Sequence, residues 1–411
     1  MSGFFTKQET QSKDRPDGKS LTCYSCGLYD KCITPKMQPY GNFKKGILNI
    51  GDYPGMADDR RGIPFQGRSG QVLQSAYEKI GIDLFEDCLN INAVNCSPID
   101  DAGKQRQPTT FEIDCCRKSI LALIEKHKPK IIVLFGFNAV YSLLGHRWKG
   151  ALNSINEWRG FTIPDQEYQA WLCPVFPPKY IDDIEKPEIK KVWEDDLYRI
   201  QKLLYEHFPV YQEPKINVIK DLSILTKTIK RGDTIAFDYE TTGLKPHAKG
   251  HRIICCSVAI NENEVFVFEM PKIVANRKPF TDILANKTIN KMAHNMKFED
   301  NWSLIRLKTP VRGWHWDSML AAHLLDNRAG VTGLKFQTYV NFGIVNYNEN
   351  VQPWLQSVES KNANSLNRLQ EYFATTKGKE ETLKYCALDS IYEYRLALKQ
   401  QKEIELLSLP F

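Results

Sequence analysis

The sequence lacks any run of apolar residues that approaches the roughly 18 needed for a membrane-spanning helix. The apolar run Ile131–Phe135 has the length of a core strand. The first residues carry Lys7, Lys13 and Arg15 in place of an apolar signal segment, and we expect residues 1–20 to form a disordered lead-in. We therefore expect no membrane partner.

Neither sign of charge is in large excess, because 55 basic and 49 acidic residues give a formal net charge of +6. Such a mild excess permits nucleic acid as a partner without requiring it. The 11 cysteines, in a chain of this size without an apolar signal segment, indicate thiols in a reducing compartment rather than a disulfide framework. We therefore expect a cytoplasmic protein.

The length of 411 residues is large for one hydrophobic core, and the pattern of elements predicts two α/β halves without internal repeats. In the first half, residues 21–207, strands alternate with helices, which favours a mostly parallel sheet. Residues 208–214 contain two prolines and lose the periodicity, so we interpret them as a linker. The expected strands are 46–50, 88–94, 130–135 and 171–176, and the expected helices are 70–80, 111–127, 138–144 and 187–206.

The second half, residues 215–411, opens with strands and becomes mainly helical. An Asn-rich polar stretch at residues 341–366 is either a loop near the substrate or a solvated surface. The expected strands are 215–219, 234–238, 252–260 and 264–268, with a helix at 222–230.

Acidic residues recur on separate elements of this second half. Asp238 and Glu240 follow a buried apolar run, and residues two apart on a strand share a face. Tyr385 and Asp389 lie four apart in a segment with helical spacing, and so share a helix face. Carboxylates held around one cleft would bind two divalent cations, which clamp the attacking and leaving oxygens of a phosphodiester. Oxygen ligands favour Mg²⁺ or Mn²⁺.

Three acidic motifs occur in the order typical of one nuclease class. They read Asp-Tyr-Glu at 238–240, Asn-Met-Lys-Phe-Glu at 295–299 and Tyr-Cys-Ala-Leu-Asp at 385–389. Over about residues 214–411 the chain resembles the DEDDy 3′→5′ exonucleases, most closely the proofreading domain of family-A DNA polymerases. The resemblance implies an RNase H-like fold and a two-metal 3′→5′ exonuclease.

The resemblance also implies a role for each motif residue. Asp238 would bridge both ions, and Glu240 and Asp389 would complete the site of the nucleophilic water. Glu299 would hold the second ion, and Tyr385 would orient the attacking water.

Two features near the second motif depart from the simple pattern. The family usually has Asp where this chain has Glu299, and Asp300 stands beside it. The register assigns Glu299 as the ligand, whereas Asp300 would point about 100° away on a helix. Asp317 lies in a stretch similar to the Asp-Thr-Met-Leu of the polymerase domain, where we expect a structural role.

The cysteines of the first half allow several kinds of site. Cys23 and Cys26 form a Cys-x-x-Cys pair, which alone is compatible with zinc, redox chemistry or no site. Together with Cys96 and Cys116, four spaced thiolates could hold zinc or an iron–sulfur cluster.

The motifs around these cysteines resemble those of family 4 uracil-DNA glycosylases. Residues 51–55 read Gly-Asp-Tyr-Pro-Gly, residues 62–70 read Gly-Ile-Pro-Phe-Gln-Gly-Arg-Ser-Gly, and residues 92–98 read Asn-Ala-Val-Asn-Cys-Ser-Pro. The resemblance covers about residues 21–205 and implies a uracil-DNA-glycosylase-like α/β fold. It implies a structural [4Fe–4S] cluster held by Cys23, Cys26, Cys96 and Cys116, with Cys32 and Cys115 as alternative ligands.

The resemblance further implies a pocket for an extruded uracil. Phe65 would stack on the base, Asn92 would read its polar edge, and Asp52 would occupy the position of the family's Glu. The family places a His before Pro-Ser near the end of the domain, whereas this chain has Pro177 there, which has no side-chain donor.

Losing one donor to a developing anion costs about 10²–10³ in rate. Tyr53 replaces a small residue and would crowd the pocket, and Lys179 would replace the lost donor only in part. Two interpretations stay open: a slowed glycosylase, or a DNA-binding or docking module without catalysis.

The joined halves resemble replication proteins of tailed bacteriophages with split polymerases. We expect no polymerase palm and fingers in this chain, because it ends shortly after Asp389. We therefore expect single-stranded DNA 3′ ends as substrate, a separate DNA polymerase as partner, and the cytoplasm of a bacterium or a bacterial host as location. A bifunctional uracil-repair enzyme is the alternative, and RNA is not excluded as a substrate.

Overall fold

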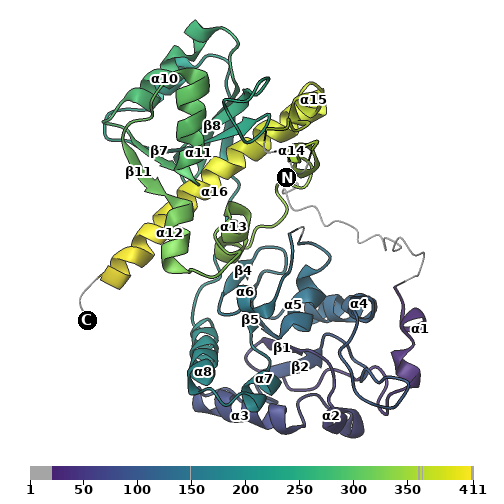
Figure 1. The fold of residues 1–411 in the computed structure, drawn as a ribbon. Coiled ribbons are helices and arrows are strands. Elements are labelled where there is room, and N and C mark those ends of the chain that lie inside the picture. The colour runs from purple at the N-terminus through teal and green to yellow at the C-terminus, as the bar shows by residue number, and fades with distance from the viewer. Residues whose placement is uncertain (1–20, 149, 360–361, 363, 409–411) are drawn as a thin grey trace. The chain divides into compact units, whose positions relative to one another are not determined.

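The computed structural model describes residues 21–148, 150–359, 362 and 364–408, so the expectation for residues 1–20 lies outside it. The chain divides into two compact units (Figure 1). The first contains the chain up to Tyr211 together with Tyr339–Val345, and the second contains Gln212–Thr338 and Asn346–Phe411. The predicted α/β class of both halves is confirmed.

The place of Tyr339–Val345 corrects the simple division after the linker, which assigned all of 215–411 to one domain. In the first unit the Tyr339 hydroxyl donates to Asp165 Oδ2 over 2.9 Å. Such a buried hydrogen bond between distant segments leaves no periodic signal in the sequence.

The sheet of the first unit is parallel except at one edge, in the order β2-β1-β3-β5-β4. Only the β4–β5 pair is antiparallel. The four predicted strands are confirmed to within two residues at each end, and β4 was missed because it is short and contains Pro164. The strands are β1 (Ile47–Gly51), β2 (Cys88–Asn92), β3 (Ile131–Phe135), β4 (Ile163–Asp165) and β5 (Ala170–Val175).

Helix α4 of the first unit begins at a capping box. At the start of α4 the Thr109 hydroxyl accepts from the Glu112 amide, and the Glu112 carboxylate accepts from the Thr109 amide. The α-helices are α1 (Cys23–Cys26), α2 (Met56–Arg61), α3 (Arg68–Lys79), α4 (Thr110–His127), α5 (Phe137–Leu144), α6 (Ile155–Trp158), α7 (Pro178–Asp183) and α8 (Pro187–Lys202), with a 3₁₀ turn at Leu28–Asp30.

The second unit has a mixed sheet in the order β11-β10-β7-β8-β9-β6. The central strand β7 extends to Thr241, beyond the expected range 234–238, and it carries both Asp238 and Glu240. The two strands beyond β7 were missed, because β10 begins with Asn290 and Lys291 and shows no apolar alternation. The strands are β6 (Lys215–Val218), β7 (Thr234–Thr241), β8 (Ile253–Asn261), β9 (Glu264–Glu269), β10 (Asn290–Ala293) and β11 (Trp314–Asp317).

The long helix α16 crosses this sheet and packs on β7, β8 and β9 (Figure 1). No helix in the described part of the chain has the length and apolar character needed to cross a membrane. The other helices are α9 (Ser223–Thr228), α10 (Lys278–Ala285), α11 (Met296–Trp302), α12 (Ser318–Leu325), α13 (Leu334–Phe342), α14 (Gln352–Leu355) and α15 (Leu369–Phe373), and α16 spans Thr376–Ser408. Short 3₁₀ and π-helical segments lie at Val274–Arg277 and Ser303–Leu307.

Candidate active sites

Strand β7 and helix α16 bring acidic side chains together in the second unit. Oxygens of Asp238 and Glu240 and the Cys386 sulfur all lie within 4.8 Å of one another. Among the described residues, this is the one group of three or more possible metal ligands that converge so closely. The geometry therefore places two of the predicted carboxylates at one point, with a thiol beside them that the sequence pattern did not indicate.

The electrostatics of this cluster disfavour full ionisation without a bound cation. Burial raises the pKa of Asp238 to about 7, and the nearby Asp389 carboxylate contributes to this rise. Burial and the neighbouring Asp238 also raise the pKa of Glu240 well above its usual range. A cation among these oxygens would relieve both the desolvation and the mutual repulsion.

Helix α11 carries a further carboxylate near the cluster, and it points the side chains of Glu299 and Asp300 in different directions. Glu299 is only 2 % exposed, and its Oε2 has no hydrogen-bond partner. Burial, followed by the charge of Asp238, raises the pKa of Glu299. Asp300 instead accepts a hydrogen bond from Trp314 Nε1 over 3.4 Å. The structure thus directs Glu299, and not Asp300, toward the cluster.

Asp317 has the structural role expected of it. Its carboxylate accepts from the backbone amides of Asn295 and Met296, over 3.1 and 3.0 Å, at the start of α11. It also accepts from the amides of Met319 and Leu320, over 3.0 and 3.2 Å, at the start of α12. One side chain therefore fixes the beginnings of two helices, one of which carries Glu299.

Two residues of the cluster escaped the sequence analysis. The Lys335 ammonium forms an ion pair with Asp389 and donates to the Tyr347 hydroxyl over 2.9 Å. It also lies 4.3 Å from the ring centroids of both Tyr347 and Tyr385. The Tyr347 hydroxyl donates to Asp389 Oδ1 over 2.6 Å. Tyr347 belongs to the Asn-rich stretch, so part of that stretch lies at the carboxylates. No sequence pattern indicated Lys335, because its partner Asp389 is 54 residues away along the chain.

Five cysteines of the first unit line a cavity of about 400 Å³. The four predicted ligands line it, whereas Cys32 does not, and its thiol donates to the Tyr29 carbonyl over 3.9 Å. The Lys36 amide donates to Cys96 Sγ over 3.2 Å, as amides do to cluster sulfurs. The thiols that line the cavity are Cys23, Cys26, Cys96, Cys115 and Cys116.

The spacing of these thiols bears on the kind of group they could hold. A single tetrahedral zinc, with Zn–S bonds of about 2.3 Å, would draw its sulfurs to within about 4 Å of each other. In the described residues no three thiols converge within 4.8 Å. Thiols set around a cavity therefore fit a multinuclear cluster better than a single ion, with Cys115 still a rival of Cys116.

Two glycines make room for the predicted uracil pocket. A Cβ at Gly70 would lie 1.9 Å from the Phe65 carbonyl oxygen, and Phe65 itself has φ of +58°, an unusual value for a non-glycine residue. A Cβ at Gly51 would lie 2.5 Å from Asn92 Oδ1 and 3.1 Å from Phe65 Cζ. The backbone thus brings Phe65 and Asn92 together, as the resemblance implies.

Asn92 has an unused donor in this pocket. The residue is 4 % exposed, and its Nδ2 has no hydrogen-bond partner. Burying an amide without a partner costs about 1–3 kcal/mol, which a ligand with an acceptor would recover. The Phe65 ring beside it packs edge-on against Phe135, with ring centroids 5.9 Å apart.

Asp52 lies against the N-terminus of α5. Its Oδ1 accepts from the Asn138 amide over 3.2 Å, and a Cβ at Gly136 would come within 2.7 Å of both carboxylate oxygens. Burial nevertheless raises the pKa of Asp52 to about 7. The neighbouring Tyr53 hydroxyl accepts from Gln107 Nε2 over 3.2 Å in an exposed hydrogen bond.

Pro177, which stands where the resembling family has its histidine, lies directly before the start of helix α7. Pro177 precedes α7, with φ of −68° and ψ of 142°, and offers no polar side-chain atom. Lys179, the proposed partial substitute, is exposed on the first turn of α7.

We expect Asp52→Asn to stabilise the first domain at pH 8 relative to wild type, and to do so far less at pH 4. A carboxyl with its pKa raised in the folded state binds more protons folded than unfolded between about pH 4 and 7. The free energy of unfolding of the wild type therefore falls as pH rises through that window. A rise of about three units in the pKa of Asp52 corresponds to a fall of up to about 4 kcal/mol. Thermal melting of both proteins at the two pH values, with Asp183→Asn at an exposed position as control, measures the difference. A constant difference would contradict the raised pKa.

Comparison with known proteins finds a family match for each half of the chain. The model of the uracil DNA glycosylase superfamily matches residues 38–196, and that of a 3′-5′ exonuclease family matches residues 215–405. The type-4 uracil-DNA glycosylase of Thermotoga maritima is 30% identical over 164 residues, which cover 40% of this chain and 80% of that protein. The type-4 enzyme of Saccharolobus solfataricus is 29% identical over 184 residues, or 44% of this chain and 82% of that protein.

The second half matches part of a much longer protein. DNA polymerase I of Chloroflexus aurantiacus is 25% identical over 207 residues, which are 48% of this chain and 20% of that protein. Among solved structures, NrnC of Brucella melitensis with bound Mg²⁺ has 18% identity and a TM-score of 0.33, covering 46% of this chain and 80% of that one. The chain therefore belongs to the uracil-DNA glycosylase superfamily through its first domain, with type-4 enzymes as relatives, and joins to it a 3′-5′ exonuclease domain.

Proposed function

We propose that the exonuclease domain removes nucleotides from the 3′ ends of single-stranded DNA with two divalent cations, Mg²⁺ or Mn²⁺. The observation that carries this proposal is the buried carboxylate cluster, in which Glu299 Oε2 has no protein partner. When bound, the cations would supply positive charge to the attacking and leaving oxygens of the phosphodiester.

The residues of the chain have distinct parts in this proposal. Asp238, Glu240, Glu299 and Asp389 would hold the ions, and Cys386 would limit the space beside Asp238. Tyr385 lies one helical turn before Asp389, where its hydroxyl would orient the attacking water.

For the first domain we propose weak uracil excision. The unpartnered Asn92 Nδ2 and the strained backbone of Phe65 support a retained base pocket, because both carry a cost without a ligand. Asp52, whose pKa burial raises to about 7, would be mostly charged only above neutral pH, where it would support a cationic sugar.

One observation favours the second candidate for this domain, a DNA-binding or polymerase-docking module without catalysis. Pro177 removes the donor that would meet the charge developing on the departing base. A separate DNA polymerase is the partner that we propose for either candidate, since the similar segment in Chloroflexus aurantiacus belongs to a polymerase.

We also propose a [4Fe–4S] cluster in the cysteine-lined cavity. Protein isolated without air should be brown and contain about four irons per chain. Cys96→Ser should lose the iron and lower the melting temperature of the first domain, because a bound group stabilises the folded state. Cys32→Ser should keep both, since Cys32 does not line the cavity. Colourless wild-type protein with one zinc would contradict the cluster.

A single assay tests both proposed activities. Single-stranded DNA labelled at its 3′ end, with and without an internal uracil, would be incubated with Mg²⁺ or with a chelator. We expect loss of the 3′ label only with Mg²⁺, and slow formation of abasic sites only with uracil. An intact 3′ label after incubation with Mg²⁺ would refute the exonuclease proposal, and an RNA strand of the same sequence measures the preference for DNA.

A further inference from the structure

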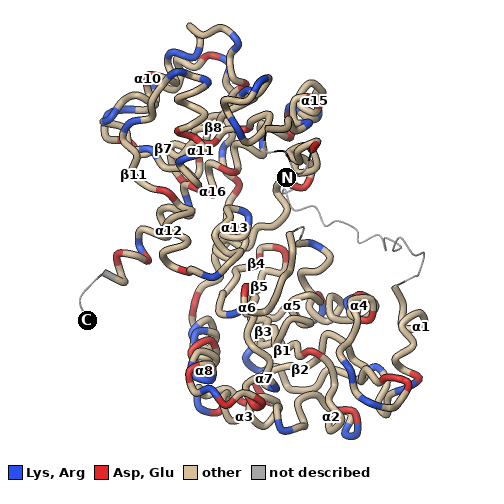
Figure 2. Tube along the Cα trace, in the orientation of Figure 1, with Lys and Arg blue, Asp and Glu red and all other residues tan. Residues whose placement is uncertain are grey.

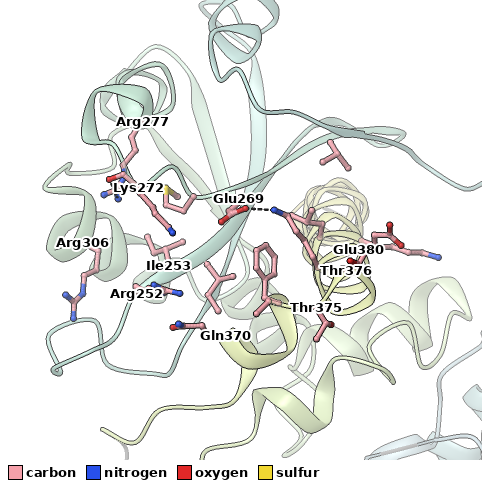
Figure 3. Close-up of a pocket in the computed structure, with 18 of the residues that line it drawn as sticks. Arg252, Ile253, Glu269, Lys272, Arg277, Arg306, Gln370, Thr375, Thr376 and Glu380 are labelled. Carbon is pink, nitrogen blue, oxygen red and sulfur yellow. Dashed lines mark hydrogen bonds and ion pairs between the residues drawn. The ribbon is translucent and has the colours of Figure 1, made fainter.

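A pocket of the exonuclease domain lies near the carboxylate cluster but does not include the predicted ion ligands. It has a volume of about 970 Å³, and none of the four predicted ion ligands lines it. The start of β8, the end of β9 and β6 form one side, and the beginning of α16 forms another (Figure 3). A volume of this size is typical of pockets that hold a small molecule or one unit of a polymer.

The rim of this pocket carries an excess of positive charge. Six basic residues face two carboxylates, Glu269 and Glu380, and one of the basic residues is already paired, Lys379 with Glu269. Along the trace, Lys and Arg positions are interspersed with Asp and Glu positions (Figure 2), and the rim is one of the places where basic residues are in excess. The basic residues are Arg252, Lys272, Arg277, Arg306, Lys379 and Lys384.

Two of these cations are available to a ligand. Arg252 and Lys272 are exposed, and within the described residues neither side chain has a hydrogen bond or ion pair. Figure 3 shows both on the same side of the pocket. They would therefore meet an anion without first breaking an interaction in the protein.

The floor of the pocket is apolar. Ile254, Phe373 and Leu383 are buried there, with Phe373 only 9 % exposed. A pocket with an apolar floor and a cationic rim matches a ligand that combines flat bases with an anionic backbone. A free phosphate would leave this floor unused.

The register of the sheet places the pocket close to the carboxylates. Strand β7 pairs with β8 so that Glu240 is opposite Cys255 and Thr241 is opposite Ile253. Ile253 lines the pocket and lies two residues from Cys255, a distance of about 7 Å along a strand. A strand held at Glu240 by its 3′ end would thus reach the pocket within a few nucleotides.

We propose that this pocket binds the single-stranded substrate a few nucleotides from its 3′ end, with phosphodiesters at Arg252 and Lys272 and a base on the apolar floor. The inference rests on the proposed exonuclease function and adds to it a subsite outside the carboxylate cluster. It implies that affinity depends on strand length, while the chemical step does not depend on the pocket.

The test reverses two charges and compares long and short substrates. In Arg252→Glu/Lys272→Glu we expect the KM for a 20-nucleotide single strand to rise at least tenfold with little change in kcat. The KM for a dinucleotide should change less than twofold. The slope of log KM against log salt should fall by about 1.4, because each phosphate of a single strand that a basic side chain neutralises contributes about 0.7 to the slope.

A matched control changes the net charge by the same amount, but at the other end of the sheet. Lys230→Glu/Lys287→Glu alters exposed lysines that precede β7 and β10 and do not line the pocket. The subsite is refuted if this control raises the KM for the long strand equally, or if the pocket variant raises the KM for the dinucleotide equally.

A binding measurement keeps the test independent of catalysis. Fluorescence anisotropy with a labelled 20-nucleotide strand, in an Asp238→Asn background, should show at least tenfold weaker binding after the Arg252/Lys272 reversal. If wild-type protein shows no nuclease activity, the proposed function is refuted. Weaker strand binding by the Arg252/Lys272 variant would still support the subsite in that case. Unchanged binding would refute the subsite. A third outcome is that strand binding stays unchanged after the reversal, while a nucleoside monophosphate competes for binding to the wild type but no longer to the variant. That outcome would assign the pocket to the released product.

Discussion

Asp238→Asn is expected to slow the release of 3′ nucleotides by at least ~10³-fold, because removing even one preorganised electrostatic group typically costs ~10²–10³. The variant should stay folded and melt at a higher temperature than wild type in the presence of a chelator. The reason is that burial and Asp389 both disfavour the charge that the substitution removes. Initial rates on 3′-labelled single strands and thermal melting with and without Mg²⁺ measure the two effects.

The neighbouring carboxylates of α11 provide a matched pair for the same assay. Glu299→Gln should lower activity by at least ~10²-fold if Glu299 holds an ion. The activity of Asp300→Asn should stay within about threefold of wild type, which corresponds to a change in activation free energy below ~1 kcal/mol. The reason is that the Asp300 carboxylate contacts Trp314 and not the cluster. The reverse order of effects would assign the ion to Asp300, and near-normal digestion by folded Asp238→Asn would refute the metal site.

Pro177→His is expected to raise uracil excision by ~10²–10³-fold, because it restores a donor where negative charge develops on the leaving base. The increase should appear in the chemical step more than in binding. The backbone permits the change: Pro177 has φ of −68° and ψ of 142°, values that a residue before proline readily adopts. Pro178 would still begin α7.

Single-turnover excision in an Asp238→Asn background isolates this effect from digestion of the strand. Pro177→Leu serves as the control, since it removes the proline ring without adding a donor. If wild type already excises uracil at the rate of an ordinary type-4 enzyme, the missing donor is not limiting. If neither wild type nor Pro177→His excises uracil while both bind DNA, the first domain is a binding module.

Short-range patterns predicted most of the architecture. Apolar runs such as Ile131–Phe135 fix buried strands, and the spacing from Tyr385 to Asp389 fixes a helix face that meets β7. The helical register also gave Glu299 and Asp300 different directions, because a one-residue step on a helix turns the side chain by about 100°, and the Asp300 carboxylate contacts Trp314. These features depend on neighbours within a few residues, which is where sequence patterns are informative.

What the sequence could not predict depends on interactions between distant segments. The carboxylate cluster acquires Lys335 and Tyr347 from a stretch without acidic motifs. Strand β10 is polar at its start, and its place in the sheet is fixed by pairing with β7 and β11 rather than by its own pattern. The cationic pocket likewise draws its residues from β8, β9 and α16, and α16 is more than a hundred residues from the two strands.

The ion pair between Lys335 and Asp389 has a consequence for how the exonuclease would respond to magnesium. An ammonium already resides among the carboxylates, so the domain can fold with one of their charges compensated. If Mg²⁺ binds as proposed, its loading would be an exchange of one cation for another, in which the Lys335 ammonium would leave Asp389 as the ion takes that oxygen. Such an exchange would raise the concentration of free Mg²⁺ at which the proposed digestion begins. The lysine would thus act as a threshold that keeps the nuclease idle when the ion is scarce.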